Sequence, residues 1–306
     1  MKKFLILLFG LSLFAIERMT MLMGTYVTIE APTFQQTQKA FAIIRDIESS
    51  LSTFKKDSLV YKLNEQKCVK PDRYLYDIIK KSLFMNENTE GYFNVAVGRI
   101  TKDIYRFGQK ERVPKKPLKN VSVDLRISLA NEKVCIPEDI KLDFGGIAKG
   151  YAVDEVAAYF RKRYIEHALI ALSGDIRCFG RCQVSVDSPF GDGSIATIYN
   201  DTDKELAVST SGIYRRYVKE QKYNHIINPY TKKAQTKIVS LTLFGKRPNY
   251  FYDAMATAIV AMGFKEARGF LKKSGLRYIM ITSNGRIFIE RGEYRVALSA
   301  DPFHIQ

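Results

Sequence analysis

The spacing of hydrophobic residues in the first third of the chain predicts one strand followed by two helices. Residues 24–31 (GTYVTIEA) alternate in polarity and are rich in β-branched side chains, a pattern typical of a strand. In residues 37–53 and 73–91, apolar side chains instead recur every three or four positions. Gly91, the last residue of the second segment, is a signal for the end of a helix. Both segments therefore predict amphipathic helices.

The rest of the chain consists mainly of short apolar runs separated by turn residues. Apolar residues at helical spacing predict helices at 153–160, 252–264 and 265–275. Strands are predicted at 167–172, 182–186, 194–199, 205–211, 223–228 and 238–244, and a closing hairpin at 277–283 and 286–291 around Asn284-Gly285. Residues 109–137, rich in Pro and Lys and then in short strands, are the best candidate for a flexible excursion. Because strands come in runs with helices inserted between them, we predict an α+β fold with mixed or antiparallel sheets and packed helices.

The N-terminus differs from the rest of the chain. Lys2 and Lys3 precede an uncharged apolar run at residues 4–15, which is too short for a comfortable membrane span. This pattern predicts that residues 1–15 form a signal peptide; an uncleaved N-terminal anchor is the alternative, because Leu13 and Ala15 make a poor cleavage site. Residues 16–306 then form the mature domain of an exported, periplasmic protein.

The formal net charge of +16 points to an anionic partner. An exported protein rarely meets nucleic acid, and no nucleic-acid-binding module is recognisable, so we expect no nucleic-acid partner. The charge is compatible with the surface of the inner membrane or with a phosphate-bearing ligand.

The four cysteines and three histidines contain no zinc-binding spacing. Cys178 and Cys182 flank a predicted tight turn and could face each other across a hairpin. They are expected to form either a disulfide or two half-buried thiols.

The segment KLDFGGIAKGYAVDEV, residues 141–156, runs from a strand end through glycines into a helix. The free N–H groups of a helix start favour phosphate, Lys149 could pair with it, and Asp143 could accept from a sugar or ring donor. The segment matches neither the P-loop nor the dinucleotide fingerprint. An ordinary strand–turn–helix corner is the alternative.

Two further segments carry candidate chemistry. Asp253 and Thr257 are four residues apart on a predicted helix, so their oxygens share one face and suit a hard cation such as Mg²⁺. His225 could act as a base, although a structural histidine is the commoner case. Residues 207–217 add hydroxyls and two arginines. Together these segments indicate metal-assisted phosphoryl chemistry on a nucleotide.

At this point the chain resembles a known family, the FAD:protein FMN transferases, also called the ApbE or thiamine-biosynthesis lipoprotein family. The matching motifs, in family order, are MGTYVTI, SLSTFKKDSLVYKLN, TEGYFNVAVG, LDFGGIAKGYAVD, SGDIRCFG, VSTSGIYRRY, HIINP and DAMATAIVAMG. They extend over residues 23–263, most of the mature chain.

The resemblance implies an exported, Mg²⁺-dependent enzyme that transfers the FMN half of FAD to a Thr or Ser hydroxyl of a partner flavoprotein and releases AMP. By motif, the FAD site would be lined by Met23, Phe54, Tyr92, Phe93, Asn94, Asp143, Lys149 and Ile227. The side chains of Asp253 and Thr257 and the backbone carbonyl of Gly146 would hold the metal. His225 would lie beside the pyrophosphate, and either His225 or Asp253 would serve as the catalytic base.

Several positions depart from the family pattern. Asn94 and Asn228 stand where the family usually has Asp, and Ile213 replaces a polar residue. Ser173 replaces the first glycine of a pair, and TKKA at 231–234 replaces a TG.P turn. Asn keeps the hydrogen bonds of Asp but not its charge, so reaction rate and acceptor choice are the properties these changes affect.

Two other functions compete with the transferase. An FAD pyrophosphatase would share the metal and pyrophosphate site and use water in place of the acceptor hydroxyl. A non-catalytic, exported flavin-binding protein would have no need of Asp253, Thr257 and His225, and these residues argue against it.

Overall fold

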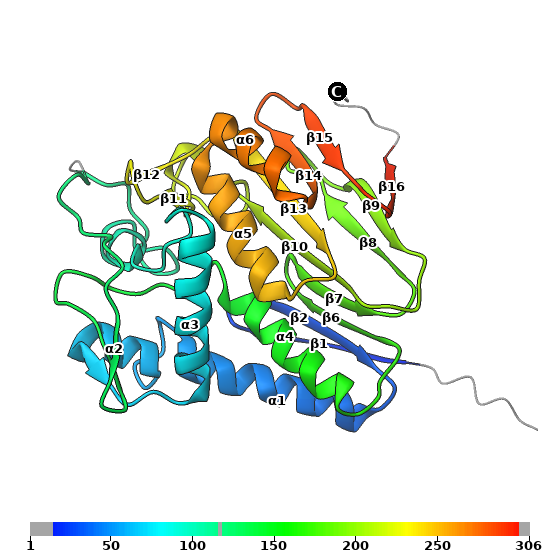
Figure 1. Ribbon diagram of the computed structural model, residues 1–306, viewed down its shortest axis with the longest axis horizontal. Helices are drawn as coiled ribbons and strands as arrows, with labels where there is room; N and C mark the ends of the chain where they lie inside the picture. The colour runs from blue at the N-terminus through cyan, green and yellow to red at the C-terminus, as the bar shows by residue number, and fades with distance from the viewer. Residues whose placement is uncertain (1–14, 116–117, 300–306) are drawn as a thin grey trace, which may run out of the picture.

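The structure is a computed structural model that describes residues 15–115 and 118–299. Its centre is an eight-stranded antiparallel sheet in the order β1-β2-β6-β7-β10-β13-β14-β15 (Figure 1). The strands are β1 (Ile16–Leu22), β2 (Thr25–Ala31), β6 (Ala168–Leu172), β7 (Asp175–Phe179), β10 (Leu206–Gly212), β13 (Ile238–Gly245), β14 (Arg277–Thr282) and β15 (Ile287–Glu290). The predicted α+β class, with antiparallel sheets and packed helices, is confirmed.

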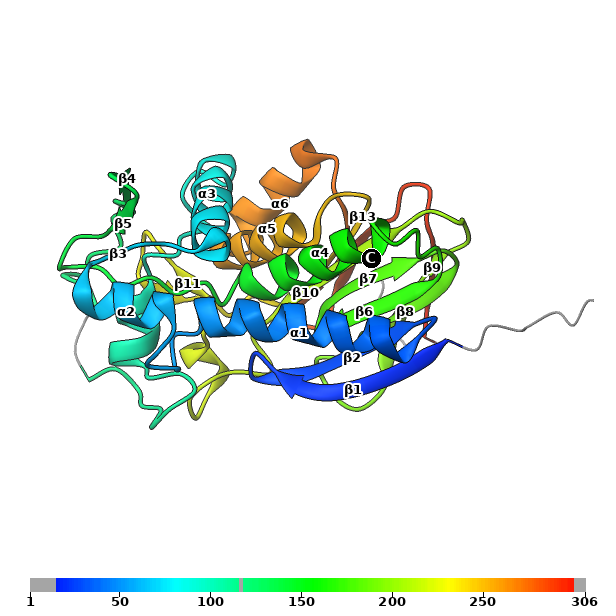
Figure 2. The ribbon, with the colours of Figure 1, turned by 90° about the horizontal axis from the view of Figure 1, so that it is seen from below.

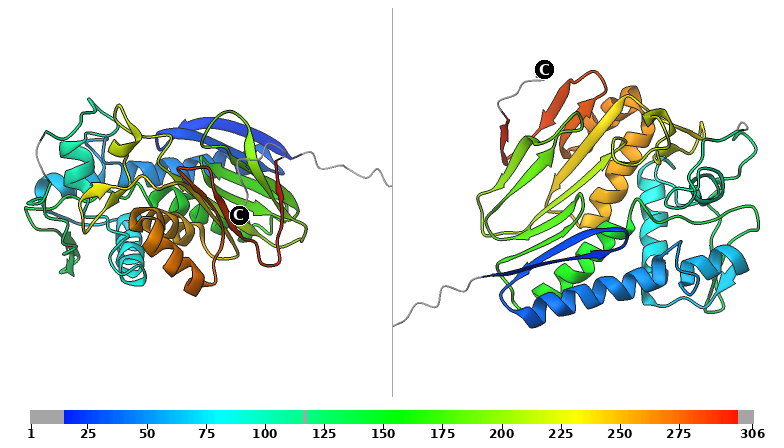
Figure 3. Two further views of the ribbon diagram at one scale, coloured as in Figure 1. Left: turned by 90° about the horizontal axis from the view of Figure 1, so that it is seen from above. Right: turned by 180° about the vertical axis from the view of Figure 1, so that it is seen from behind.

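Helices form a layer over one face of this sheet, as Figure 2 and the rear view in Figure 3 show. Helix α1 (Phe34–Leu51) packs on β1 and β2, α4 (Ala148–Arg161) on β6 and β7, and α5 (Asn249–Met262) on β10 and β13. Outside these lie α2 (Leu59–Gln66), α3 (Arg73–Asn88) and α6 (Phe264–Ser274). Local signals begin several helices: Thr33 caps α1 in a capping box with Gln36, and Asp72 caps α3.

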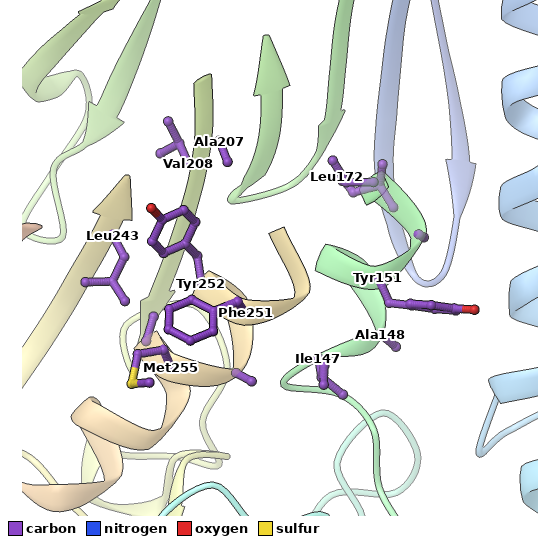
Figure 4. Close-up of a cluster of buried hydrophobic side chains, with 14 of the residues drawn as sticks. Ile147, Ala148, Tyr151, Leu172, Ala207, Val208, Leu243, Phe251, Tyr252 and Met255 are labelled. Carbon is purple, nitrogen blue, oxygen red and sulfur yellow. The ribbon is translucent and has the colours of Figure 1, made fainter. Parts of the chain in front are cut away.

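The main hydrophobic core lies between the helices and the sheet. Figure 4 shows the part that places the site: Ile147 and Tyr151 at the start of α4, Phe251 and Met255 on α5, and Val208 on β10. The near-continuous apolar sequences of α5 and β13 follow from burial between these layers. The facing surfaces of α4 and α5 are therefore held at a fixed separation.

A smaller antiparallel sheet, in the order β16-β9-β8, packs on the same core. Its strands are β8 (Cys182–Asp187), β9 (Ser194–Asn200) and β16 (Arg295–Leu298). The predicted hairpin across Cys178 and Cys182 is wrong, because β7 pairs with β6 and β10 in the large sheet while β8 pairs with β9. A disulfide nevertheless joins Cys178 to Cys182 as the chain crosses between the two sheets.

A third sheet pairs the two short strands of the predicted excursion, β4 (Ser128–Ala130) and β5 (Lys133–Cys135), with β3 (Cys68–Val69), in the order β3-β5-β4. A disulfide between Cys68 and Cys135, which the sequence did not predict, ties the excursion to the end of α2. The excursion is therefore anchored covalently at its C-terminal end.

A second, smaller hydrophobic cluster lies at one end of the molecule, formed by Ile100, Tyr105, Phe107, Val218 and Ile227. It joins residues 99–115 and 118–123 to residues 213–236, and these parts of the chain lie side by side in Figures 1 and 3. The segments include a π-helix η1 (Arg99–Ile104), a 3₁₀ turn η2 (Gln221–Tyr223), β11 (Ile227–Asn228) and β12 (Lys233–Ala234). The strand predicted at 223–228 is thus reduced to its last two residues.

The leader predicted at residues 1–15 lies outside the described residues except for Ala15. Among the residues that are described, no helix combines the length and the apolar character needed to cross a bilayer. The predicted helices and most predicted strands are confirmed, whereas β1, α2, η1, β7 and β16 were not predicted.

Candidate active site

A cavity of about 370 Å³ opens where the strands of the large sheet, the starts of α4 and α5 and the second cluster meet. Most residues predicted for the site line this cavity although they come from distant parts of the chain. They are Tyr92, Phe93, Asn94, Asp143, Gly146, Lys149, His225, Ile227, Asp253 and Thr257. A volume of this size is typical of a site for a small molecule or cofactor.

Met23 and Phe54 lie outside the cavity lining. Met23 is in the turn between β1 and β2, and its N–H donates to the Glu48 carboxylate at 3.0 Å. Phe54 is 45% exposed, and its ring lies under the ammonium of Lys102, 4.4 Å from the ring centroid. Because Lys102 lines the cavity, Phe54 is close to its rim. Contact of Met23 and Phe54 with FAD stays a prediction.

Asp253, Thr257 and Gly146 form one oxygen-rich corner of the cavity. Asp253 and Thr257 are one turn apart on α5, and a Cβ at Gly146 would be only 2.9 Å from the Thr257 hydroxyl. Glycine therefore allows this backbone to approach the Thr257 side chain. The Thr257 hydroxyl also lies 3.1 Å from the Ser211 hydroxyl, and one Asp253 oxygen accepts from the Gly150 N–H at 3.0 Å.

This donor set fits Mg²⁺. Its members are hard oxygen ligands, and Mg²⁺ in proteins usually takes one or two carboxylates and completes its shell with water and substrate phosphate. Within the described part of the chain, no group of three His, Cys, Asp or Glu side chains is arranged to hold a metal. A cation held by these oxygens would complete its shell with water and the oxygens of a bound phosphate.

A partly buried cation between two buried carboxylates adjoins this corner. The Lys149 ammonium, in the first turn of α4, is 3.0 Å from Asp175 and 3.8 Å from Asp253. Burial opposes the charged ammonium, but the carboxylates of Asp175 and Asp253 outweigh it and raise the pKa of Lys149. Burial and the neighbouring Asp175 carboxylate in turn raise the pKa of Asp253.

Asp175 was missed by sequence reasoning. It is the first residue of β7, almost fully buried, and accepts a hydrogen bond from Ser209 at 2.7 Å. Its signal was present: a carboxylate directly after a glycine within SGDIRCFG. In sequence, an aspartate after a glycine usually indicates no more than the start of a strand. Asp175 gains its charged partner, Lys149, only because α4 packs beside β7 in the folded protein.

Asp143 organises the turn before α4. Its carboxylate accepts from the Thr101 hydroxyl at 2.6 Å and from the Gly145 N–H at 3.1 Å, and Lys102 lies 3.3 Å away. Burial opposes ionisation, but Lys102, the Thr101 hydroxyl and Arg216 outweigh it and lower the pKa of Asp143. Asp143 is therefore ionised and links the turn to η1.

His225 presents a neutral imidazole to the cavity. Its Nδ1 is 3.0 Å from the Arg216 carbonyl, which can only accept, so Nδ1 carries the proton and Nε2 the lone pair. Burial and the nearby Arg216 guanidinium lower the pKa of His225 to about 4. At neutral pH the ring is therefore uncharged, and its Nε2 lone pair is available to a hydroxyl donor.

The hydroxyl and arginine segment at 207–217 also reaches the cavity. The Thr210 and Ser211 side chains bond to Thr242 and Thr257, and Arg215 forms an ion pair with Asp187 of β8. The cavity lining also contains residues that the sequence did not indicate: Thr101, Lys102, Phe107, Ser185 and Asp187. The cavity is thus lined by hydroxyls and cations, a surface suited to phosphate oxygens.

Comparison with known proteins agrees with this geometry. The ApbE family model matches residues 23–280, which include nearly all the residues described above. The chain belongs to the ApbE family.

The relatives are curated as FAD:protein FMN transferases. Those of Vibrio cholerae serotype O1 and Treponema pallidum are each 26% identical, over 81% and 83% of this chain and 79% of their own lengths. The crystal structure of the ApbE protein of Thermotoga maritima MSB8 superposes with a TM-score of 0.78 at 27% identity, covering 91% of this chain and 97% of that one. The flavin transferase ApbE of Vibrio cholerae shares the fold, with a TM-score of 0.73 and 22% identity over 94% and 97% of the two chains.

The departures from the ApbE pattern have local structural causes. Asn94 accepts from the Ala96 N–H and donates to the Val123 carbonyl, both at 2.8 Å. Asn228 accepts from two N–H groups of the following turn and donates to the Ala261 carbonyl at 2.9 Å. A carboxylate could not donate either bond, so in this chain the amides join neighbouring segments.

Two other ApbE departures are also explained. Ile213 is fully buried in the main core, where a polar side chain would need a partner. Ser173 has φ 57°, in the left-handed region that favours the glycine of the family pattern. Ser173 therefore adopts a backbone conformation that glycine takes more readily.

Proposed function

We propose that this protein is an FAD:protein FMN transferase that uses Mg²⁺ to move the FMN half of FAD to a Thr or Ser hydroxyl of a partner flavoprotein, releasing AMP. The activity is the one named for its curated relatives. The observation that carries the proposal is the meeting of Asp253, Thr257 and Gly146 in one corner of a cavity that Lys149 and His225 also line.

Asp253, Thr257 and the Gly146 carbonyl are the groups that would hold Mg²⁺. Bound there, the cation would supply Lewis acidity that withdraws charge from the pyrophosphate and stabilises the leaving phosphate of AMP. The chain's own cations complement this role, because Lys149, Lys102 and Arg216 line the same cavity.

The reaction forms one bond and breaks one. The acceptor oxygen attacks the phosphorus of the FMN half, and the bond from that phosphorus to the bridging oxygen breaks, so AMP leaves with the electron pair. His225 Nε2 accepts the hydroxyl proton during the attack and passes it on to solvent. We assign the base to His225 because Asp253 already accepts from Gly150 and faces Lys149.

We further propose that the enzyme is exported and acts in the periplasm, at or near the inner-membrane surface. The basic and apolar pattern of residues 1–15 supports this location. The two disulfides add support, because disulfides persist mainly in oxidising compartments. The acceptor would then be a flavoprotein exposed on that side of the membrane.

Removal of the metal-corner carboxylate tests the proposal. In the Asp253→Ala variant, AMP release from FAD in the presence of Mg²⁺ and an acceptor should fall by about 100-fold or more. The matched control is Asp203→Ala, which removes a carboxylate that is exposed on the surface and paired with Arg181. Turnover near that of the unmodified protein in Asp253→Ala would overturn the metal assignment.

A further inference from the structure

The positive charge of this chain is concentrated in two segments. Residues 99–123 contain eight Lys and Arg against two acidic residues, and residues 213–236 contain six against one. Together these segments contribute +11 of the net charge of +16, about two thirds of the charge from about a sixth of the residues. The rest of the chain is close to balanced.

The fold brings the two segments together. The described residues of these segments, 99–115, 118–123 and 213–236, share the second hydrophobic cluster, and we call them the basic lobe. Within it the Lys232 ammonium donates to the Lys119 carbonyl at 2.6 Å, and Val218 packs with Tyr105 and Phe107. Two basic segments ninety residues apart in sequence therefore lie together at one end of the molecule (Figure 1).

Much of this charge is neither neutralised nor used by the cavity. Lys110, Lys119, Lys219 and Lys233 are exposed, lie outside the cavity lining, and take part in no ion pair among residues 15–115 and 118–299. Two of the three acidic residues of the lobe are already in ion pairs, Asp103 with Lys141 and Glu220 with Lys222. The third, Glu111, accepts a hydrogen bond from the Gly108 N–H at 3.0 Å. The exposed lysines therefore create a positive electrostatic potential on the solvent-facing side of the lobe.

The basic lobe borders the place that a second substrate must reach. His225, Arg215, Arg216 and Phe107 belong to the lobe and also line the cavity. We propose that the basic lobe is the docking surface for an acidic face of the acceptor protein, which it orients so that the target hydroxyl enters the cavity beside His225. This inference rests on the proposed function, since it assigns the partner of that same site.

Two other anionic partners fit the arrangement less well. The phosphates of FAD would pair with the cations that line the cavity, whereas the four exposed lysines lie outside it. A bilayer covering the lobe would also cover the cavity mouth that the lobe borders. A protein surface can meet the lobe along one side and still present a hydroxyl at the opening, and charge complementarity of this kind sets orientation and association rate.

The test compares two fourfold charge reversals in the full chain. The lobe variant carries Lys110→Glu, Lys119→Glu, Lys219→Glu and Lys233→Glu. The control variant carries Lys39→Glu, Lys162→Glu, Lys204→Glu and Lys265→Glu, all at exposed positions elsewhere. Each set lowers the net charge from +16 to +8, so position is the only difference. The probe is a short fluorescent peptide with one Thr among Asp and Glu residues, alongside the same peptide with Asn and Gln in their place.

At physiological ionic strength the unmodified protein should bind the acidic peptide and not its neutral counterpart. The lobe variant should bind it at least about tenfold more weakly, and the control variant within about threefold of the unmodified protein. Equal weakening in both variants, or no binding by the unmodified protein, overturns the proposal. If the lobe variant loses only its binding to phosphatidylglycerol vesicles, the surface is a lipid site and the proposal is wrong.

FAD binding, measured by equilibrium dialysis, separates this inference from the proposed function. The lobe variant should bind FAD as the unmodified protein does, because its four positions lie outside the cavity. Absence of FAD binding in the unmodified protein would contradict the proposed function, while the peptide result would still decide whether the lobe is a docking surface.

Discussion

At the residue scale, the site is organised by a partly buried cation between two buried carboxylates. Lys149 lies between Asp175 and Asp253, closer to Asp175, so Asp175 holds the ammonium away from the carboxylate assigned to the metal. A charge in a largely buried site is destabilised when its partner is removed, unless it can pair with another opposite charge. Asp175 thereby affects how available Asp253 is to a cation.

The Asp175→Asn variant tests this role. With its nearer partner neutral, Lys149 should pair with Asp253 and compete with Mg²⁺ there. The Mg²⁺ concentration for half-maximal AMP release should rise by about tenfold, which corresponds to about 1.4 kcal/mol. Asp203→Asn is the surface control. An unchanged Mg²⁺ dependence in Asp175→Asn would show that Asp175 has no such role.

His225 gives a prediction about stability and pH. Its pKa is about 4 in the folded protein and about 6.5 in an unfolded chain, so between these values only the unfolded state binds the proton. Because His225 is held neutral, it contributes up to about 3 kcal/mol to the free energy of unfolding. This contribution is complete above about pH 6.5 and is lost as the pH falls toward 4. The charged groups that act on the ring are Arg216, Lys149 and Asp143.

Urea unfolding at pH 5 and pH 7 measures this effect. His225→Gln keeps a donor for the Arg216 carbonyl and removes the titration. The difference in unfolding free energy between the two pH values should be smaller in the variant, and parallel pH profiles for the two proteins would contradict the assignment.

At the element scale, the site depends on how closely α4 and α5 approach. Gly150 of α4 faces the first residues of α5, where an added Cβ would be 2.5 Å from the Asn249 carbonyl oxygen and 2.8 Å from the Asp253 Cβ. Because the neighbour is backbone, no side chain can move aside to make room. This contact fixes the distance between Lys149 and Asp253.

Gly150→Ala should therefore separate the helices and destabilise the protein by about 1–3 kcal/mol, despite the higher helix propensity of alanine. The control is Gly269→Ala on α6, where no atom lies within 4 Å of the added Cβ. That change should stabilise the protein by up to about 1 kcal/mol. Chemical denaturation of both variants measures these effects, and equal stability of the two would contradict the packing argument.

The periodicity of apolar residues and the positions of turn residues were enough to predict most helices and strands. They were not enough to predict which strands pair in a sheet. The helices at 37–53 and 73–91 appear as α1 and α3 because their periodic apolar faces pack on the core. β1 was missed because its alternating residues are only partly buried. The hairpin at Cys178 and Cys182 was wrong because a local turn signal cannot reveal that two consecutive strands join different sheets.

The same limit applies to the site. Asp253 and Thr257 could be predicted as a pair because helix geometry alone places them on one face. Asp175 and Lys102 could not, because their role depends on packing between segments distant in sequence. The convergence of Asp143, Lys149 and His225 was implied by family resemblance, not by any local pattern.

At the scale of the whole molecule, two disulfides of different loop length support the fold. Cys68–Cys135 spans 67 residues and Cys178–Cys182 spans 4. On the chain-entropy account, the longer loop should contribute about 4 kcal/mol and the shorter one about 2 kcal/mol.

Replacement of both cysteines of each bridge by alanine tests this order. The Cys68→Ala/Cys135→Ala protein should lose more unfolding free energy than the Cys178→Ala/Cys182→Ala protein, as measured by thermal or urea unfolding. The reverse order would show that local packing around the bridges, and not loop closure, determines their contribution.

The architecture also separates two tasks. The rigid interface of α4, α5 and the large sheet holds the groups assigned to the phosphates and the metal. The basic lobe, with its own small hydrophobic cluster, supplies His225 and the charged rim. One part of the molecule is thus suited to bind FAD and the other to receive the acceptor.

The most direct test of the central claim is the fate of the flavin when the protein is incubated with FAD, Mg²⁺ and a purified flavoprotein acceptor. We expect release of AMP and covalently bound, fluorescent flavin on the acceptor, seen in a denaturing gel, with about one AMP per flavin attached. Both products should disappear when Mg²⁺ is chelated. AMP with only free FMN would instead show a pyrophosphatase, and FAD bound without any AMP release would show a flavin-binding protein; either result would contradict the proposed function.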